Sequence, residues 1–205
     1  MSNRRTFLVL ITVSLWQVTG RLVRPTAAQS LDGRASAFVK SIGDKLVAVV
    51  NGSDGDRDKR AKLTAIIDGA VDVDGVARFC LGRFWHNASA EQQQRYTELF
   101  HQVLVTNITS KLGEYRGVRF IMGRTQQHDD NAVVSTVVER PNNPPTNVDW
   151  IISNPGSDPK IIDVIAEGTS LRLTQRQDYA SYLSRNNNNI DALINAMRQQ
   201  VAQAG

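Results

Sequence analysis

The side chains in this sequence that could take part in chemistry are one cysteine and three widely separated histidines. His86 falls at the end of a helical pattern, His101 lies off the apolar side of another, and His128 lies in a polar turn. Catalysis by a nucleophile needs a base within hydrogen-bonding reach, and a metal site needs several ligands close together. We interpret the histidines as surface residues and expect no metal and no cofactor. Cys80 has no partner for a disulfide and is expected to be a small buried hydrophobic residue.

Two aspartates, Asp149 and Asp163, interrupt segments that are otherwise apolar. A carboxylate inside an apolar cavity can act as a general base. The alternative is an acid at a strand edge that is paired with an arginine, with Arg119, Arg140 and Arg172 as available partners. The sequence has no nucleophile elbow, phosphate-binding loop or zinc-protease motif, so it favours a protein that is not an enzyme.

Residues 1–28 have the pattern of a secretory signal. Two arginines, Arg4 and Arg5, precede the apolar run 7–18, and Thr26-Ala-Ala28 is a plausible cleavage site. The run is shorter than the roughly 20 residues that span a bilayer. The segment 3–8 also resembles a twin-arginine export signal, with the general secretory route as the alternative. Both routes lead to the periplasm, so we expect a mature domain over 29–205.

The positive charge of the whole chain comes from this leader. The sequence has 24 basic and 20 acidic residues. Four of the basic residues (Arg4, Arg5, Arg21 and Arg24) lie in 1–28, which contains no acid. The mature chain is therefore formally neutral, whereas a nucleic-acid-binding protein needs a basic surface. We expect no nucleic acid among its partners.

Helical periodicity dominates the first half of the mature chain. Ser89 and Gln92 form a capping box, which opens what we expect to be the longest helix. The expected helices are 35–50, about 58–70, about 74–85 and 90–112, with Asp58 as the cap of the second and Asp72 or Asp74 as the cap of the third.

The second half changes to short segments rich in β-branched residues, separated by turn residues. Short connections favour an antiparallel meander, because parallel crossovers need a dozen or more residues. Several of the expected strands are apolar on both faces, as in 132–138, so the face that helices leave uncovered must itself be covered or line something apolar. The chain is expected to be α+β. The expected strands are 118–122, 132–140, 148–152 and 160–166, followed by a helix with Thr174 and Gln177 as a capping box and a last helix from Ile190.

An ordered series of segments resembles the MlaC family, the toluene-tolerance auxiliary proteins of ABC transporters, over about residues 35–200. The segments are Asp72-Val-Asp-Gly-Val-Ala-Arg78, Leu81-Gly-Arg-Phe-Trp85, Ala88-Ser-Ala-Glu-Gln92, Tyr96 to Phe100, Val134-Ser-Thr-Val137, Val148-Asp-Trp150 and Ile162 to Leu171. The segments 174–181 and 191–198 resemble the hopanoid-associated branch, HpnM. The tryptophan-containing strand that the family usually has before its Asp-Val segment is replaced here by Ser157-Asp-Pro-Lys160.

The resemblance implies a monomeric periplasmic carrier of phospholipid, or of a hopanoid-type lipid, which serves the lipid asymmetry of the outer membrane. Its expected partners are an inner-membrane MCE/ABC transporter complex and an outer-membrane lipoprotein complex. The implied fold is an NTF2-like curved antiparallel sheet of about four strands, with covering helices and a helical subdomain, enclosing an apolar cavity.

We expect the cavity to be lined from both halves of the chain, with plain core packing as the alternative for each residue. Two other functions remain open: an NTF2-like cavity enzyme that uses Asp149 or Asp163 as base on an isoprenoid-like substrate, and an adaptor without a ligand. The candidate lining residues are Trp85, Phe100, Leu104, Ile108, Phe120, Met122, Val134, Thr136, Val138, Trp150 and Ile152.

Overall fold

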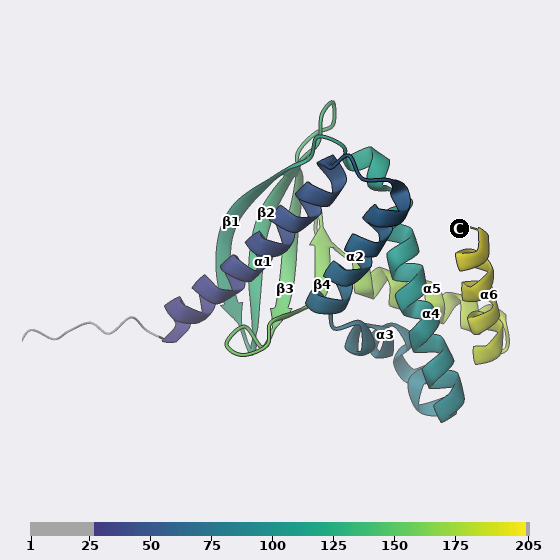
Figure 1. Ribbon diagram of the computed structural model, residues 1–205. Coiled ribbons are helices and arrows are strands. Elements are labelled where there is room, and N and C mark those ends of the chain that lie inside the picture. Colours follow the sequence, from purple (N-terminus) through teal and green to yellow (C-terminus); the bar gives the residue numbers. More distant parts are fainter. Residues whose placement is uncertain (1–26, 204–205) are drawn as a thin grey trace, which may run out of the picture.

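The computed structural model describes residues 27–203, and their side chains from residue 31 to 203. A curved antiparallel sheet forms one side of the molecule and a group of helices the other, with α1 running across the sheet (Figure 1). The α+β class predicted from the sequence is confirmed. The expected leader falls outside the described residues apart from its last two, which begin α1. None of the helices in the described part of the chain has the length and apolar character needed to cross a bilayer.

The helices follow the predicted order, with three corrections. The third expected helix, about 74–85, ends as an α-helix at Leu81 and continues as a 3-10 helix to Asn87. The longest helix is α1 rather than the helix that follows Ser89, and the second helix begins at Asp56, behind Gly55, so that Asp58 lies in its first turn. The bounds are α1 Ala27–Asn51, α2 Asp56–Ala70, α3 Val73–Leu81, the 3-10 helix η1 Gly82–Asn87, α4 Ala90–Thr109, the 3-10 helix η2 Leu112–Tyr115, α5 Leu171–Arg185 and α6 Ile190–Gln203.

Side-chain caps fix where several helices start. The Asp72 carboxylate accepts a hydrogen bond from the Gly75 N–H at 3.0 Å and opens α3. The predicted capping box of α4 is confirmed, because Ser89 Oγ accepts from the Gln92 N–H and the Gln92 side chain accepts from the Ser89 N–H. The box predicted at Thr174 is wrong. The cap of α5 is Ser170, four residues earlier, at the end of a strand.

The strands are β1 Arg119–His128, β2 Asn131–Glu139, β3 Thr146–Ser153, β4 Lys160–Ala166 and the two-residue β5 Thr169–Ser170. They pair in chain order and antiparallel throughout, so the predicted meander is confirmed and has one short additional strand. The register shifts once in β1, between Met122 and Thr125, and once between β3 and β4 at Ile151/Ile152. The isolated bridge between Val71 and Ile161 ties the α2–α3 connection to β4.

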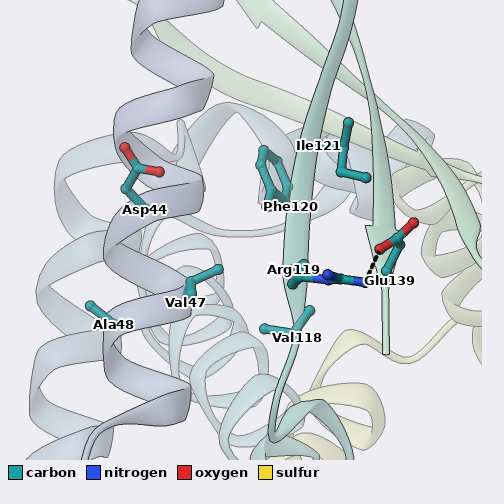
Figure 2. Close-up of a pocket in the computed structure, with 8 residues that line it drawn as sticks. All are labelled: Asp44, Val47, Ala48, Val118, Arg119, Phe120, Ile121 and Glu139. Carbon is teal, nitrogen blue, oxygen red and sulfur yellow. Dashed lines mark ion pairs between the residues drawn. The ribbon is translucent and has the colours of Figure 1, made fainter. Parts of the chain in front are cut away.

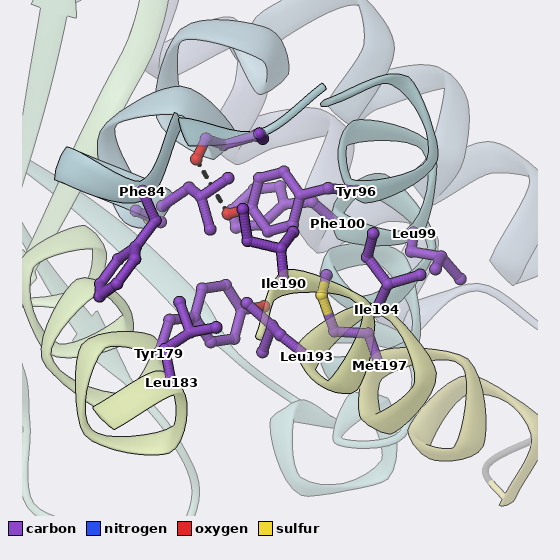
Figure 3. Close-up of a cluster of buried hydrophobic side chains, with 14 of the residues drawn as sticks. Phe84, Tyr96, Leu99, Phe100, Tyr179, Leu183, Ile190, Leu193, Ile194 and Met197 are labelled. Carbon is purple, nitrogen blue, oxygen red and sulfur yellow. Dashed lines mark hydrogen bonds between the residues drawn. The ribbon is translucent and has the colours of Figure 1, made fainter. Parts of the chain in front are cut away.

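Two separate hydrophobic clusters hold these layers together. The inner cluster joins α1 and the end of α2 to one face of the sheet, around Val39, Val134 and Ile152. The helical cluster joins α3, η1, α4, α5 and α6 around Tyr96, whose hydroxyl donates to the Ala77 carbonyl at 2.9 Å (Figure 3). Because the helical cluster contains no strand residue, the helical side of the molecule has a core of its own.

The capping box predicts a measurable contribution to stability. Replacement of Ser89 by alanine removes the acceptor for the Gln92 N–H and is expected to lower the free energy of unfolding by about 1 kcal/mol. Urea denaturation followed by circular dichroism measures this. Ser184→Ala, an exposed position inside α5, is the matched control, and equal midpoints for the two variants would contradict the assignment.

Candidate functional site

The inner face of the sheet, which faces α1 and α2, collects the candidate lining residues from the strands. Alternation along β2 and the β2–β3 register place Val134 and Thr136 on this face beside Trp150 and Val148. Val134, Thr136 and Ile152 are buried, whereas Phe120, Met122, Val138 and Trp150 stay half-buried although they point toward the covering helices. The seven predicted strand residues therefore share one apolar surface, and part of it remains accessible.

A hydrogen-bond chain fixes the tryptophan in this surface. The Trp150 indole donates to Thr136 Oγ1 at 2.9 Å, and the Thr136 hydroxyl donates to the Val148 carbonyl at 3.1 Å. Phe120 packs edge-on against the Trp150 ring, with the ring centroids 5.8 Å apart. A buried threonine with both functions satisfied holds the indole in one orientation.

Helix α1 contacts Phe120 on the inner face through the backbone of Gly43, which has no side chain. A Cβ atom added at Gly43 would lie 2.6 Å from two ring carbons of Phe120, so the ring packs directly on the helix. Glycine inside a helix costs about 1 kcal/mol relative to alanine, and the residue type is explained here by this close approach.

Two hollows lie along the flanks of α1, and both are open to solvent. The larger, of about 760 Å³, lies between α1 and β1 (Figure 2). Its floor is apolar, and its rim carries Asp44 together with the ion pair between Arg119 and Glu139, whose nitrogen and oxygen are 3.0 Å apart. We call it the α1–β1 groove. Its lining residues are Asp44, Val47, Ala48, Val118, Arg119, Phe120, Ile121 and Glu139.

The smaller hollow, of about 360 Å³, lies between α1 and α2. Three of its lining residues, Phe38, Ile42 and Ile66, also belong to the inner cluster, so it too reaches the apolar interior. Neither hollow is the enclosed cavity that the sequence predicts. The larger hollow opens between α1 and the edge of the sheet, and the smaller one opens on the other flank of α1, between the two helices.

The candidate lining residues from the helices are not brought to this surface as a group. Trp85 and Phe100 belong to the helical cluster, where both contact Tyr96 with ring centroids 6.5 and 6.0 Å away. Leu104 is half-buried and Ile108 is 36% exposed, and neither is part of the two clusters. A lipid-lining role for these four residues stays a prediction.

The sequence missed the contribution of α1 and α2 to this site. The pattern of apolar residues predicts the helices 35–50 and about 58–70 that carry Phe38, Ile42 and Ile66, but it does not indicate that they line this site, and it gives no role to Gly43. A glycine inside a strongly periodic helix is a signal for close packing that could have pointed to this surface.

The two aspartates considered as bases have different surroundings. Asp163 is buried, and each of its oxygens is occupied. Oδ1 accepts from the N–H groups of Val164 and Arg172, and Oδ2 accepts from the Ser170 hydroxyl and lies 3.3 Å from Nε of Arg172. This arrangement ties β4 to the start of α5 and favours the paired interpretation. Asp149 lies on the opposite face of the sheet from Trp150, half-buried, between Ser135 and Ile165 in the register.

The cysteine is buried, and the three histidines lie at or near the surface. Cys80 is buried in the helical cluster, burial raises the pKa of its thiol to about 12, and Sγ lies 3.5 Å from the Arg172 carbonyl. His101 pairs with Asp68 at 2.6 Å, while His86 and His128 are exposed. Within residues 31–203, no group of three or more histidine, cysteine or acidic side chains could hold a metal ion.

Comparison with known proteins identifies the family. The family described as MlaC protein matches residues 40–199, which cover the inner face, both grooves and most of the helical side. This chain belongs to the MlaC family. The resemblance noted in the sequence is thereby confirmed, and the match includes the segments that carried it.

Two relatives resemble the chain over most of its length. The toluene tolerance protein Ttg2D of Pseudomonas putida is 27% identical over 144 residues, which are 69% of this chain and 67% of that protein. The structure of the phospholipid-binding protein from Ralstonia solanacearum in complex with a phospholipid superposes with a TM-score of 0.70. It is 23% identical in sequence, and the match covers 83% of this chain and 98% of that one. This MlaC-family chain therefore has the same fold as that protein.

The position of Asp163 predicts a structural effect of its replacement. Asp163→Asn removes the charge that faces Arg172 in a buried setting, and is expected to cost about 3 kcal/mol of unfolding free energy. Chemical denaturation measures the loss, and Asp149→Asn is the matched control with an expected change below about 0.5 kcal/mol. Unchanged stability of the Asp163 variant would contradict the structural role and would favour the alternative in which Asp163 is a general base.

Proposed function

We propose that this chain is a periplasmic carrier that binds a lipid by its acyl chains along the inner face of the sheet. The observation that carries the proposal is the half-buried apolar surface of Phe120, Met122, Val138 and Trp150 on the inner face of the sheet, at whose edge Phe120 lines an open groove beside α1. Apolar side chains that point inward and still meet solvent leave an unfavourable surface, which an acyl chain would cover.

The relatives support the chemical class of the ligand. The Ralstonia protein is a phospholipid-binding protein with a phospholipid in its structure, and it has the fold of this chain over nearly its whole length. The family and the fold together make a phospholipid the ligand of first choice. The hopanoid-type lipid suggested by segments 174–181 and 191–198 is the finer alternative within the same class.

The energetics of such binding need no catalytic group. Each buried methylene contributes about 0.8 kcal/mol, so two chains of some fifteen carbons would gain on the order of 20 kcal/mol before ordering costs. A ligand of this kind needs an apolar surface and a polar mouth. Asp44, Arg119 and Glu139 at the rim of the α1–β1 groove are suited to a head group, because Arg119 is 80% exposed and can exchange its carboxylate partner for a phosphate.

The family resemblance supports a proposal for the system in which the carrier would work. We place the chain between an outer-membrane lipoprotein complex and an inner-membrane MCE/ABC transporter complex, as a monomer after cleavage of the 1–28 leader. The mature domain over 29–205 would then exchange its lipid with both complexes in turn.

Native mass spectrometry of protein purified from the periplasm without detergent tests the proposal. The expected result is a complex with one co-purified phospholipid per chain. Val138→Trp places bulk on the inner face and is expected to lower the retained lipid at least fivefold. Val137→Trp adds the same bulk to the neighbouring residue on the outer face and is expected to leave it unchanged.

A wild-type protein that emerges free of lipid, and that takes none up from phosphatidylglycerol vesicles, would refute the carrier function. Equal loss of lipid in both tryptophan variants would instead show that the inner face is not where the lipid lies. Circular dichroism of each variant confirms that both are folded before lipid is quantified.

A further inference from the structure

Phe120 belongs both to the lining of the α1–β1 groove and to the inner cluster. Of the eight residues that line the α1–β1 groove, it is the one that also belongs to the inner cluster. On the groove side its neighbours are Val47 and Val118, and on the inner side it meets the ring of Trp150. The ring of Phe120 therefore lies where the groove and the inner cluster meet.

The ring of Phe120 lies against α1 at a position that has no side chain. It rests on Gly43, which presents only backbone, and the contact would be a clash if that residue had a side chain. Phe120 has no polar atom to anchor its ring. The opposite wall is fixed, because the Trp150 indole is hydrogen-bonded to the buried Thr136.

Both ends of α1 are fastened to the sheet side by polar contacts. Near its start, Arg34 donates to the Gly156 carbonyl at 2.6 Å and Asp32 accepts from the Gln127 side chain at 2.8 Å. At its end, the Asn51 side chain accepts from the Gly117 N–H at 2.7 Å. Rotation of one side chain in the middle would open a passage without breaking these contacts, whereas displacement of the whole helix would break them.

From these contacts we propose that Phe120 controls the passage of an acyl chain between the α1–β1 groove and the inner face. In the closed position the ring is seated on Gly43 and separates the two. When the ring leaves this seat, the apolar floor of the groove becomes continuous with Met122 and Trp150. The inference rests on the proposed lipid-binding function and adds to it the residue that sets the rate of exchange.

The test measures uptake kinetics with delipidated protein and vesicles of pyrene-labelled phosphatidylglycerol, whose excimer emission falls as lipid leaves the membrane. Phe120→Ala is expected to take up the probe at least fivefold faster than wild type, and Phe120→Leu at an intermediate rate. Val137→Ala, on the outer face, is expected to match wild type. A merely structural role for the ring would lower the amount bound and leave the rate unchanged.

A second experiment uses an engineered disulfide between α1 and β1. The distance of 3.1 Å between a Cβ at position 43 and the Phe120 Cγ brings the two Cβ atoms within reach of a disulfide. The double variant Gly43→Cys/Phe120→Cys has no ring at position 120, and its disulfide would tie α1 to β1. It is expected to exchange lipid at least fivefold faster than wild type in both the oxidised and the reduced state. Slowing on oxidation that dithiothreitol reverses would show that α1 itself must move, and would overturn the role of the ring. The native Cys80 is buried in the other cluster and should stay out of this reaction.

The two proposals fail in different ways. Wild-type protein that takes up no probe under any condition refutes the lipid-carrier function itself. Wild-type protein that takes up the probe, combined with rates equal to wild type in Phe120→Ala and in both states of the double cysteine variant, overturns the role of Phe120 alone.

Discussion

The need to cover a sheet that is apolar on its inner face is the constraint on which this structure depends. Antiparallel sheets usually bury one face completely against a layer of helices. Here, the main contact over β1 and β2 comes from a single helix, α1, which crosses the strands and leaves a groove on each flank. The same helix that stabilises the sheet therefore leaves part of the covered surface accessible.

The separation of the two hydrophobic clusters allows this incomplete cover. Tyr96, Tyr179 and Phe100 pack against one another in the helical cluster, with ring centroids 6.0 to 6.5 Å apart, and none of them contributes to the inner cluster. The helical side is joined to the sheet through Asp163 and Arg172 and through the bridge at Val71. The helical side thus has a hydrophobic core that does not depend on how the inner face is packed.

Local chemistry made much of the fold predictable from the sequence. The Ser89–Gln92 capping box, the β-branched strands and the short turns each determine a conformation over a few residues, and all three were confirmed. The start of α5 was not predicted, because the two-residue strand β5 runs directly into it and Ser170 serves both elements. Thr174 and Gln177 have the spacing of a capping box, but Thr174 lies inside α5.

The site was predicted in part, for a reason that follows from geometry. Alternation along β2 and β3 is enough to sort Val134, Thr136 and Trp150 onto one face, since strand periodicity is two. Which helix lies over that face depends on contacts distant in sequence, so the close approach at Gly43 was not predicted. Trp85 and Phe100 pack in the helical cluster, and their lipid-lining role stays a prediction. The amphipathic pattern of a helix predicts which side of the helix is buried, but it does not predict which element packs against that side.

The sequence separation of the α1 contacts has a consequence for how the chain acquires its structure. The strands pair with their immediate neighbours in sequence, but the hydrogen bonds that fasten α1 join residues 66, 95 and 122 positions apart. Contacts of such separation form late, because the loop they close costs entropy first. Although α1 precedes every other described element in the chain, it would dock last, on a sheet that has already formed. Until then, the apolar side of α1 and the inner face of the sheet would both be exposed to solvent.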